Sequence, residues 1–222
     1  MINKELSKRI LTSFFLVLLL ILMYSYTYIL IISLIIISLI SWIEFYGLIS
    51  KIFMKQNFNN KIFIFLLKIL SLLYLSLFSF IIVKVKLDSS ITQIFIIYSF
   101  LVSVTSDIGG LVFGKMFKGK KLTRISPNKT ISGSIGSFIL SMMLIPLFID
   151  QFTNLEILQL TILTFIISLV SQSGDLFISY LKRKARVKDT GDLLPGHGGF
   201  LDRIDGVLFS VPTGLMLFKI IY

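Results

Sequence analysis

Long apolar runs separated by short polar connections dominate this sequence. Seven runs can be distinguished, each nearly free of charge, at 10–26, 27–46, 62–83, 91–113, 131–149, 155–181 and 200–222. A helix rises 1.5 Å per residue, so about 20 apolar residues cross a hydrocarbon core of about 30 Å. The pattern predicts an all-α fold, a polytopic transmembrane helical bundle with about seven spans.

The first two runs adjoin, and their joint length decides how they are divided. A single helix over residues 10–46 would be roughly 55 Å long, which is too long for one crossing. We therefore expect a tight reversal near residues 25–27.

Composition supports the membrane assignment and excludes several kinds of chemistry. The chain is 55% hydrophobic, with a mean hydropathy of +0.93, and a soluble fold could not bury that much apolar surface. It has no cysteine, so disulfides, thiolate metal sites and cysteine nucleophiles are excluded.

The net charge of +11 would suggest nucleic acid in a soluble protein, but here the placement of the charges matters more. Most Lys and Arg residues lie in the N-terminal tail and in alternate connections, as the positive-inside rule requires. We expect a cytoplasmic N-terminus and no nucleic-acid partner. We divide the chain into N-terminal membrane helices (1–90) and a catalytic membrane region (91–222) with two cytoplasmic basic loops, 115–130 and 182–203.

Four aspartates lie in or at the edge of apolar runs, where an ionisable group is costly and therefore a functional candidate. They are Asp107, Asp175, Asp202 and Asp205, all near the cytoplasmic ends of their spans. Asp202 and Asp205 are three positions apart, which places both on one helix face and suits a shared cation. Oxygen ligands in a chain without cysteine favour Mg²⁺ or Mn²⁺ over zinc.

The opposing interpretation is that these aspartates form structural salt bridges with Lys182, Arg183 or Arg203. Four carboxylates at one depth, beside two basic loops, favour the metal interpretation.

The only histidine, His197, lies between glycines in the segment PGHGGF, where the backbone can approach a ligand closely. A helix opening near Phe200 would direct its free N–H groups and positive dipole end towards a phosphate held there. A hydrogen bond within the loop is the alternative role for His197.

The first basic loop ends in a turn, Ser126-Pro127-Asn128-Lys129-Thr130, directly before a new apolar helix. Hydroxyls, glycines and a lysine at a helix N-terminus are suited to hold an oxyanion. A helix-packing role for Gly133 and Gly136 is an equally good explanation of the glycines.

Residues 179–205, SYLKRKARVKDTGDLLPGHGGFLDRID, resemble the signature of the phosphatidate cytidylyltransferases. Gly174-Asp175-Leu176 and the turn 126–130 resemble two further elements of that family. The resemblance covers roughly residues 106–206, with a weaker echo in residues 42–46. The upstream motif departs from the family pattern, because Ile131-Ser132 stand where Trp-Glu is common.

The resemblance implies an enzyme that condenses CTP with phosphatidic acid to CDP-diacylglycerol and pyrophosphate, in the membrane of a bacterial cell with the active site facing the cytoplasm. It implies Mg²⁺, with Mn²⁺ as the alternative and a second cation as an option. The lipid bilayer is a further partner, and a homodimer is a candidate assembly. The implied catalytic residues are Asp175, Asp202, Lys182, Arg183, Lys188 and His197; substrate-binding residues are Ser126, Lys129, Thr130, Asp189 and Arg203; metal ligands are Asp175, Asp202, Asp205 and Asp107.

Three other functions remain open at this point. A CTP-dependent polyprenol or lipid-alcohol kinase shares part of the architecture and differs in its products. In a cation-coupled transporter the aspartates would bind a cation in transit. Such proteins usually have repeated halves, and no internal repeat is visible. A lipid-binding module without catalysis explains the cations and leaves the carboxylates unexplained.

Overall fold

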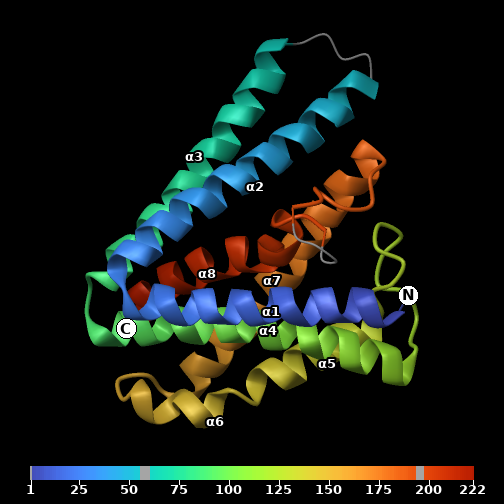
Figure 1. The fold of residues 1–222 in the computed structure, drawn as a ribbon. Helices are drawn as coiled ribbons and strands as arrows, with labels where there is room; N and C mark the ends of the chain where they lie inside the picture. Colours follow the sequence, from blue (N-terminus) through green and yellow to red (C-terminus); the bar gives the residue numbers. More distant parts are fainter. Residues whose placement is uncertain (1, 56–60, 194–197) are drawn as a thin grey trace. The chain divides into compact units, whose positions relative to one another are not determined.

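The computed structural model describes residues 2–55, 61–193 and 198–222 (Figure 1). Within these ranges the regular structure is helical, apart from isolated bridge residues: Lys121 and Thr130, which pair with one another, and Gly198. The elements are α1 (Ile2–Ser25), α2 (Thr27–Lys55), α3 (Lys61–Lys86), α4 (Ser90–Phe117), α5 (Ile131–Met142), α6 (Ile145–Phe148), the 3₁₀ turn η1 (Ile149–Gln151), α7 (Ile157–Ala185) and α8 (Leu201–Ile221).

The predicted fold class is confirmed. Six apolar stretches of the described chain are long enough to cross a membrane, and Leu11–Ser25 of α1 is a shorter seventh. The expected reversal is also confirmed, because α1 ends at Ser25 and α2 begins at Thr27.

The run expected at 131–149 is apolar throughout but is not one helix. It is divided into α5, α6 and η1, with a turn at residues 143–144. Pro146 lies in the first turn of α6, where its missing N–H costs no hydrogen bond. The proline therefore starts a new helix in place of continuing the old one.

The chain divides into two compact units. The first unit comprises Met1–Lys86 and Leu181–Arg203, and the second comprises Leu87–Tyr180 and Ile204–Tyr222. The residues of α7 and α8 are shared between the units.

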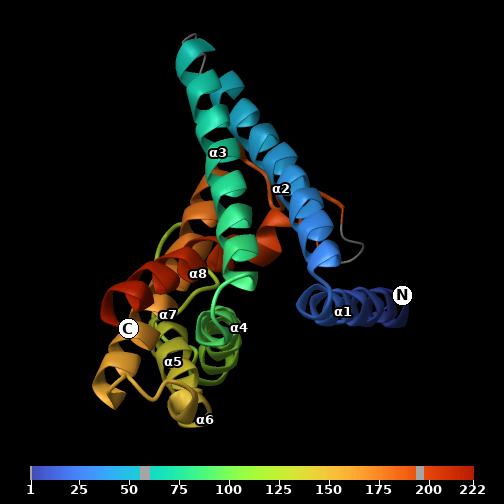
Figure 2. The same cartoon turned by 90° about the vertical axis from the view of Figure 1, so that its left-hand side faces the viewer.

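In the first unit, α2 and α3 lie side by side as a hairpin, which both views show (Figures 1 and 2). The Ser38 and Ser79 hydroxyls join the two helices at 2.6 Å, and the Trp42 indole N–H donates to the Lys68 carbonyl at 3.0 Å. Where water is absent, small hydroxyl residues and polar bonds supply much of the attraction between helices.

In the second unit, hydroxyl pairs connect α4 with α7 along their length. Tyr98 bonds to Thr164, Ser103 lies 2.7 Å from Ser171, and Ser106 lies 2.9 Å from Ser168. All six side chains are buried. These pairs hold α7, and with it Asp175, at a fixed register against α4.

Glycines bring α4 and α5 into backbone contact. A Cβ on Gly109 would lie 2.5 Å from the Gly136 carbonyl oxygen, and one on Gly133 would lie 2.7 Å from the Gly110 carbonyl oxygen. Gly133 and Gly136 are therefore packing residues, as the second of the two sequence interpretations proposed.

Candidate active site

The second basic loop begins where α7 ends. The Arg186 N–H donates to the Arg183 carbonyl at 3.1 Å, and the Val187 N–H donates to the Lys182 carbonyl at 3.0 Å. This is the bond pattern of a Schellman ending, in which Arg186 takes the left-handed conformation with φ 55°. The ending turns the chain sharply and leaves the basic residues of the last turn at the negative end of the helix dipole.

A buried carboxylate from α2 holds the other end of this loop. Glu44 is only 5% exposed, and it accepts hydrogen bonds from the Phe200 N–H at 2.9 Å, the Leu201 N–H at 2.9 Å and the Thr190 hydroxyl at 2.7 Å. We call these four residues the Glu44 clamp. It ties α2, the loop and the start of α8 together within the first unit.

Glycines make room for the Glu44 carboxylate. A Cβ on Gly191 would lie 2.7 Å from Oε1, and one on Gly199 would lie 2.7 Å from Oε2. Either methyl group would displace the carboxylate from its donors. These two glycines of the signature segment thus serve a contact with a residue about 150 positions earlier, as the 156-position separation of Glu44 and Phe200 shows.

The expectation that the opening of α8 receives a phosphate is wrong for the N–H groups of Phe200 and Leu201. Both donate to Glu44, so the anion at this positive helix end belongs to the protein itself. His197, the other residue of that prediction, lies outside the described residues.

Next to the clamp, Lys182 and Asp202 form an ion pair with an Nζ–Oδ1 distance of 2.6 Å. The second oxygen of Asp202 accepts the Thr190 N–H at 2.8 Å and the Thr190 hydroxyl at 3.1 Å. The Asp202 side chain is only 8% exposed. Asp202 thus has a structural role, closing the loop onto the first turn of α8, whatever else it does.

The second unit holds another pair, Lys129 with Asp175. Lys129 comes from the first basic loop and Asp175 from α7, and both side chains are partly accessible, 25% and 29% exposed. The Ser179 hydroxyl donates to Asp175 Oδ1 at 3.3 Å. Asp107 on α4 interacts electrostatically with both members, repelled by Asp175 and attracted by Lys129. Three of the predicted residues are therefore gathered at one place.

The backbone of the first basic loop fixes Lys129. Its carbonyl accepts the Leu122 N–H at 2.8 Å, and its N–H donates to the Ser126 carbonyl at 3.1 Å, which closes a turn. Thr130 is the N-cap of α5, with its hydroxyl accepting the Gly133 N–H at 3.0 Å. Ser126 and Thr130 thus position Lys129, besides any contact they make with a substrate.

Asp205 lies in the second unit, where α8 packs closely against α7. A Cβ on Gly174 would lie 2.7 Å from the Asp205 carbonyl oxygen, so the Gly-Asp element allows this approach. The Asp205 side chain is buried, and its Oδ1 accepts the Gly206 N–H at 2.9 Å.

The remaining predicted residues are exposed at the surface. They are Arg183, Lys188, Asp189 and Arg203. Within the ranges that the structure describes, no three carboxylate or histidine side chains form a group that could hold a metal ion by themselves.

Glu44 is the site residue that sequence reasoning missed. Two signals were available: it belongs to the weak echo at residues 42–46, and it is a lone acid in a long apolar run, which is costly without partners.

The fold defines an integral membrane protein of the all-α class, and each of its two units holds a lysine–aspartate ion pair. The chain belongs to the cytidylyltransferase family, whose profile matches residues 1–221.

Over 121 residues it is 46% identical to the phosphatidate cytidylyltransferases of Staphylococcus haemolyticus (strain JCSC1435) and Staphylococcus aureus (strain COL), and 43% identical to that of Staphylococcus saprophyticus subsp. saprophyticus. Each match covers 53% of this chain and 46% of the relative, so the chain spans about half the length of the curated relatives it matches.

The Glu44 clamp predicts energetic coupling between α2 and the loop. In a double-mutant cycle on unfolding in detergent, Glu44→Ala and Thr190→Val should show a coupling of about 1–2 kcal/mol, because the first change removes the acceptor and the second removes the donor of the same buried hydrogen bond.

The control for this cycle is Thr190→Ser, which keeps the hydroxyl, so that Thr190→Ser alone should destabilise the protein less than Thr190→Val does. Additive effects of Glu44→Ala and Thr190→Val would contradict the clamp.

Proposed function

We propose that this protein is a phosphatidate cytidylyltransferase, which joins CTP to phosphatidic acid and releases pyrophosphate. The observation that carries the proposal is the Lys129–Asp175 pair beside Asp107, in a chain of the cytidylyltransferase family. It combines a phosphate-binding cation with carboxylates of the type that bind Mg²⁺. The relatives are phosphatidate cytidylyltransferases, and their name gives phosphatidate as the acceptor and a cytidylyl group as the group transferred.

The reaction needs no protein nucleophile. A phosphate oxygen of phosphatidic acid attacks the α-phosphorus of CTP, a new P–O–P bond forms, and the bond from the α-phosphorus to the β-phosphate bridging oxygen breaks. The electron pair of that bond leaves with pyrophosphate. The main barrier is bringing two polyanions together in line, so positioning and neutralisation of charge provide most of the catalysis.

The lysines of the two ion pairs suit this task. An arriving phosphate can take over the hydrogen bond that an aspartate accepts in the free protein, so that the lysine stays neutralised throughout. Lys129 is the more accessible of the two, and we assign it to a substrate phosphate. We also assign Lys182 to a substrate phosphate. The exposed cations Arg183, Lys188 and Arg203 would attract the anionic substrates to the surface.

The carboxylates fit Mg²⁺ as a cofactor. Groups of three acidic or histidine side chains are absent from the described part of the chain, and Mg²⁺ commonly takes one or two carboxylates with substrate phosphates and water. Asp175 is the best ligand because it is partly accessible, and Asp107, Asp202 and Asp205 are the further candidates. When bound, the ion would neutralise triphosphate charge. Asp189 remains a candidate for substrate contact at the surface.

We further propose that the site faces the cytoplasm of a bacterial cell, where CTP is available. The asymmetry of Lys and Arg between alternate connections supports this orientation.

The experiment that tests the proposal follows two radiolabels. CTP labelled at the α-phosphate should transfer its label to the lipid phase in the presence of phosphatidic acid and Mg²⁺, whereas label at the γ-phosphate should leave as pyrophosphate. Omission of phosphatidic acid or addition of EDTA should abolish transfer.

Two outcomes of the labelling experiment would overturn the proposal. Transfer of the γ-label to a lipid alcohol would identify a kinase. Folded protein that transfers neither label with all components present would exclude the transferase.

The Lys129–Asp175 pair gives a second prediction. Asp175→Asn should lower turnover about 100-fold or more, the usual cost of removing one group that stabilises transition-state charge. Asp150→Asn, the same change at an exposed aspartate of the same unit, should leave turnover near wild type.

A charge swap separates the catalytic role of the pair from a structural one. Lys129→Asp combined with Asp175→Lys should unfold closer to the wild-type temperature than either single change, because it restores an ion pair, yet remain inactive. Recovery of turnover in the swapped protein would show that the pair is only structural.

A further inference from the structure

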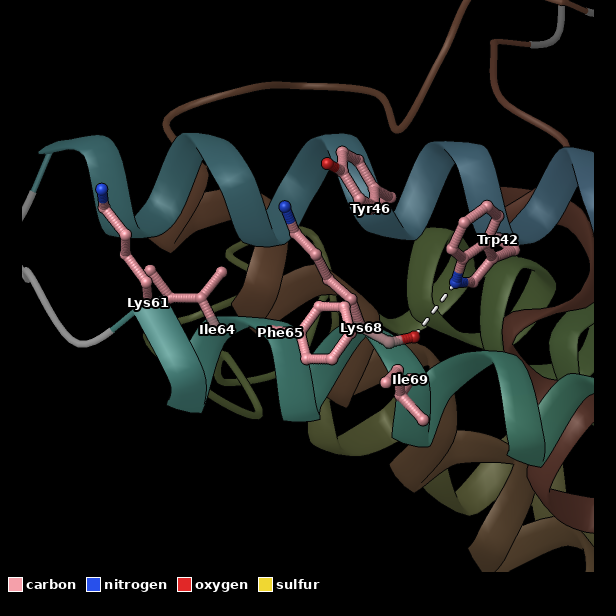
Figure 3. A pocket seen from close by; sticks show the side chains of 7 residues that line it. All are labelled: Trp42, Tyr46, Lys61, Ile64, Phe65, Lys68 and Ile69. Carbon is pink, nitrogen blue, oxygen red and sulfur yellow. Dashed lines mark hydrogen bonds between the residues drawn. The ribbon is translucent and has the colours of Figure 1, made fainter.

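The hairpin of α2 and α3 carries a groove that the proposed chemistry does not use. It has a volume of about 370 Å³ and is lined by Trp42, Tyr46, Lys61, Ile64, Phe65, Lys68 and Ile69 (Figure 3). All of these residues belong to the first unit. The groove joins two cations, two aromatic rings with polar atoms and an apolar floor.

Lys68 is the unusual member of this lining. It lies seven residues after the start of α3, about 10 Å along an apolar helix, where an ammonium group is costly. Within the described part of the chain it forms no ion pair with a carboxylate. Its Nζ lies 3.5 Å from the centroid of the Tyr46 ring, and Figure 3 shows the amine directed to that ring.

A cation–π contact offsets only part of the cost of this charge. Such contacts are weak compared with a full ion pair, whereas an ammonium group within an apolar span is costly. An anion in the groove would supply the missing counter-charge. The Lys61 side chain, exposed at the start of α3, adds a second cation on the same side.

Trp42 and Tyr46 form a fixed aromatic wall of the groove, and apolar residues of α3 lie opposite them. The Trp42 indole is fixed by its hydrogen bond to the Lys68 carbonyl and by an edge-to-face contact with Tyr46 at 5.6 Å. Phe65 is 62% exposed, which leaves its ring available to a hydrocarbon chain. Amphipathic rings and lysines of this kind gather where a bilayer changes from headgroup to hydrocarbon.

We propose that this groove binds a bilayer phospholipid with an anionic headgroup. Its phosphate lies with the amines of Lys61 and Lys68, and an acyl chain follows Phe65 and Ile69. Basic pockets between membrane helices bind anionic headgroups by the same charge complementarity. None of the residues that line the groove is assigned to the transfer reaction, and the proposal does not depend on that assignment.

The sole tryptophan of the chain, Trp42, reports on the groove directly. In vesicles of zwitterionic lipid, a small fraction of brominated phosphatidylglycerol should quench Trp42 fluorescence about fivefold more efficiently than the same fraction of brominated phosphatidylcholine. That factor is what one lysine contributes near an anionic headgroup. High salt should reduce the preference, because the charges are then screened.

The variants test whether the groove lysines cause the preference. Lys68→Met should bring the two quenching efficiencies close together, while keeping the apolar stem and the backbone carbonyl that Trp42 binds. Lys61→Met, at an exposed position, should reduce the preference in part and covers the case that Lys68→Met does not fold. Lys84→Met removes a lysine at the other end of α3 and should leave the preference intact.

Equal quenching by the two lipids in the wild-type protein would overturn the proposal, as would an equal loss in Lys84→Met and Lys68→Met. The measurement uses no CTP, so its failure would be distinct from a failure of the transferase proposal.

Discussion

The path of the signature segment depends on one buried carboxylate. Glu44 reaches from the middle of α2 to the first N–H groups of α8 and to Thr190, and the glycines beside it leave no space for a side chain. A carboxylate at this depth is unfavourable unless its oxygens are bonded, and the opening of a helix provides both donors and a positive dipole end. Glu44 needs hydrogen-bond donors, and the N–H groups of the helix opening need an acceptor. Their contact therefore fixes the position of α2 relative to the loop within the first unit.

The need of a poorly solvated charge for a bonded partner also explains the two lysine–aspartate pairs. Charged side chains near apolar helices are costly unless they are paired. Each unit contains a lysine–aspartate pair of this kind, Lys182–Asp202 in the first unit and Lys129–Asp175 in the second. In each pair the charges of the lysine and the aspartate offset one another. It also provides the cation and the carboxylate to which we assign the substrate phosphate and Mg²⁺, which links the stability of the fold to the proposed chemistry.

Local patterns in the sequence were enough to predict the helical class, the reversal at Tyr26 and the residues that the family signature contains, because hydropathy and motif spacing are properties of short stretches. They were not enough for Glu44, whose partners lie far along the chain, nor for the ion pairs, since several lysines could have paired with each aspartate. The break after α5 has a local cause in Pro146, but hydropathy does not reveal it, because the residues on both sides of the break are apolar. The hydroxyl pairs between α4 and α7 also need the register of two distant helices, which serine positions alone do not define.

Amide hydrogen exchange at Phe200 and Leu201 tests the central role of Glu44 most directly. In the wild-type protein both amides should exchange slowly, because they donate to a buried carboxylate, and in Glu44→Ala they should exchange at least tenfold faster while the amides in the middle of α2 remain protected. Rapid exchange of both amides in the wild-type protein, or protection that survives Glu44→Ala, would contradict the account.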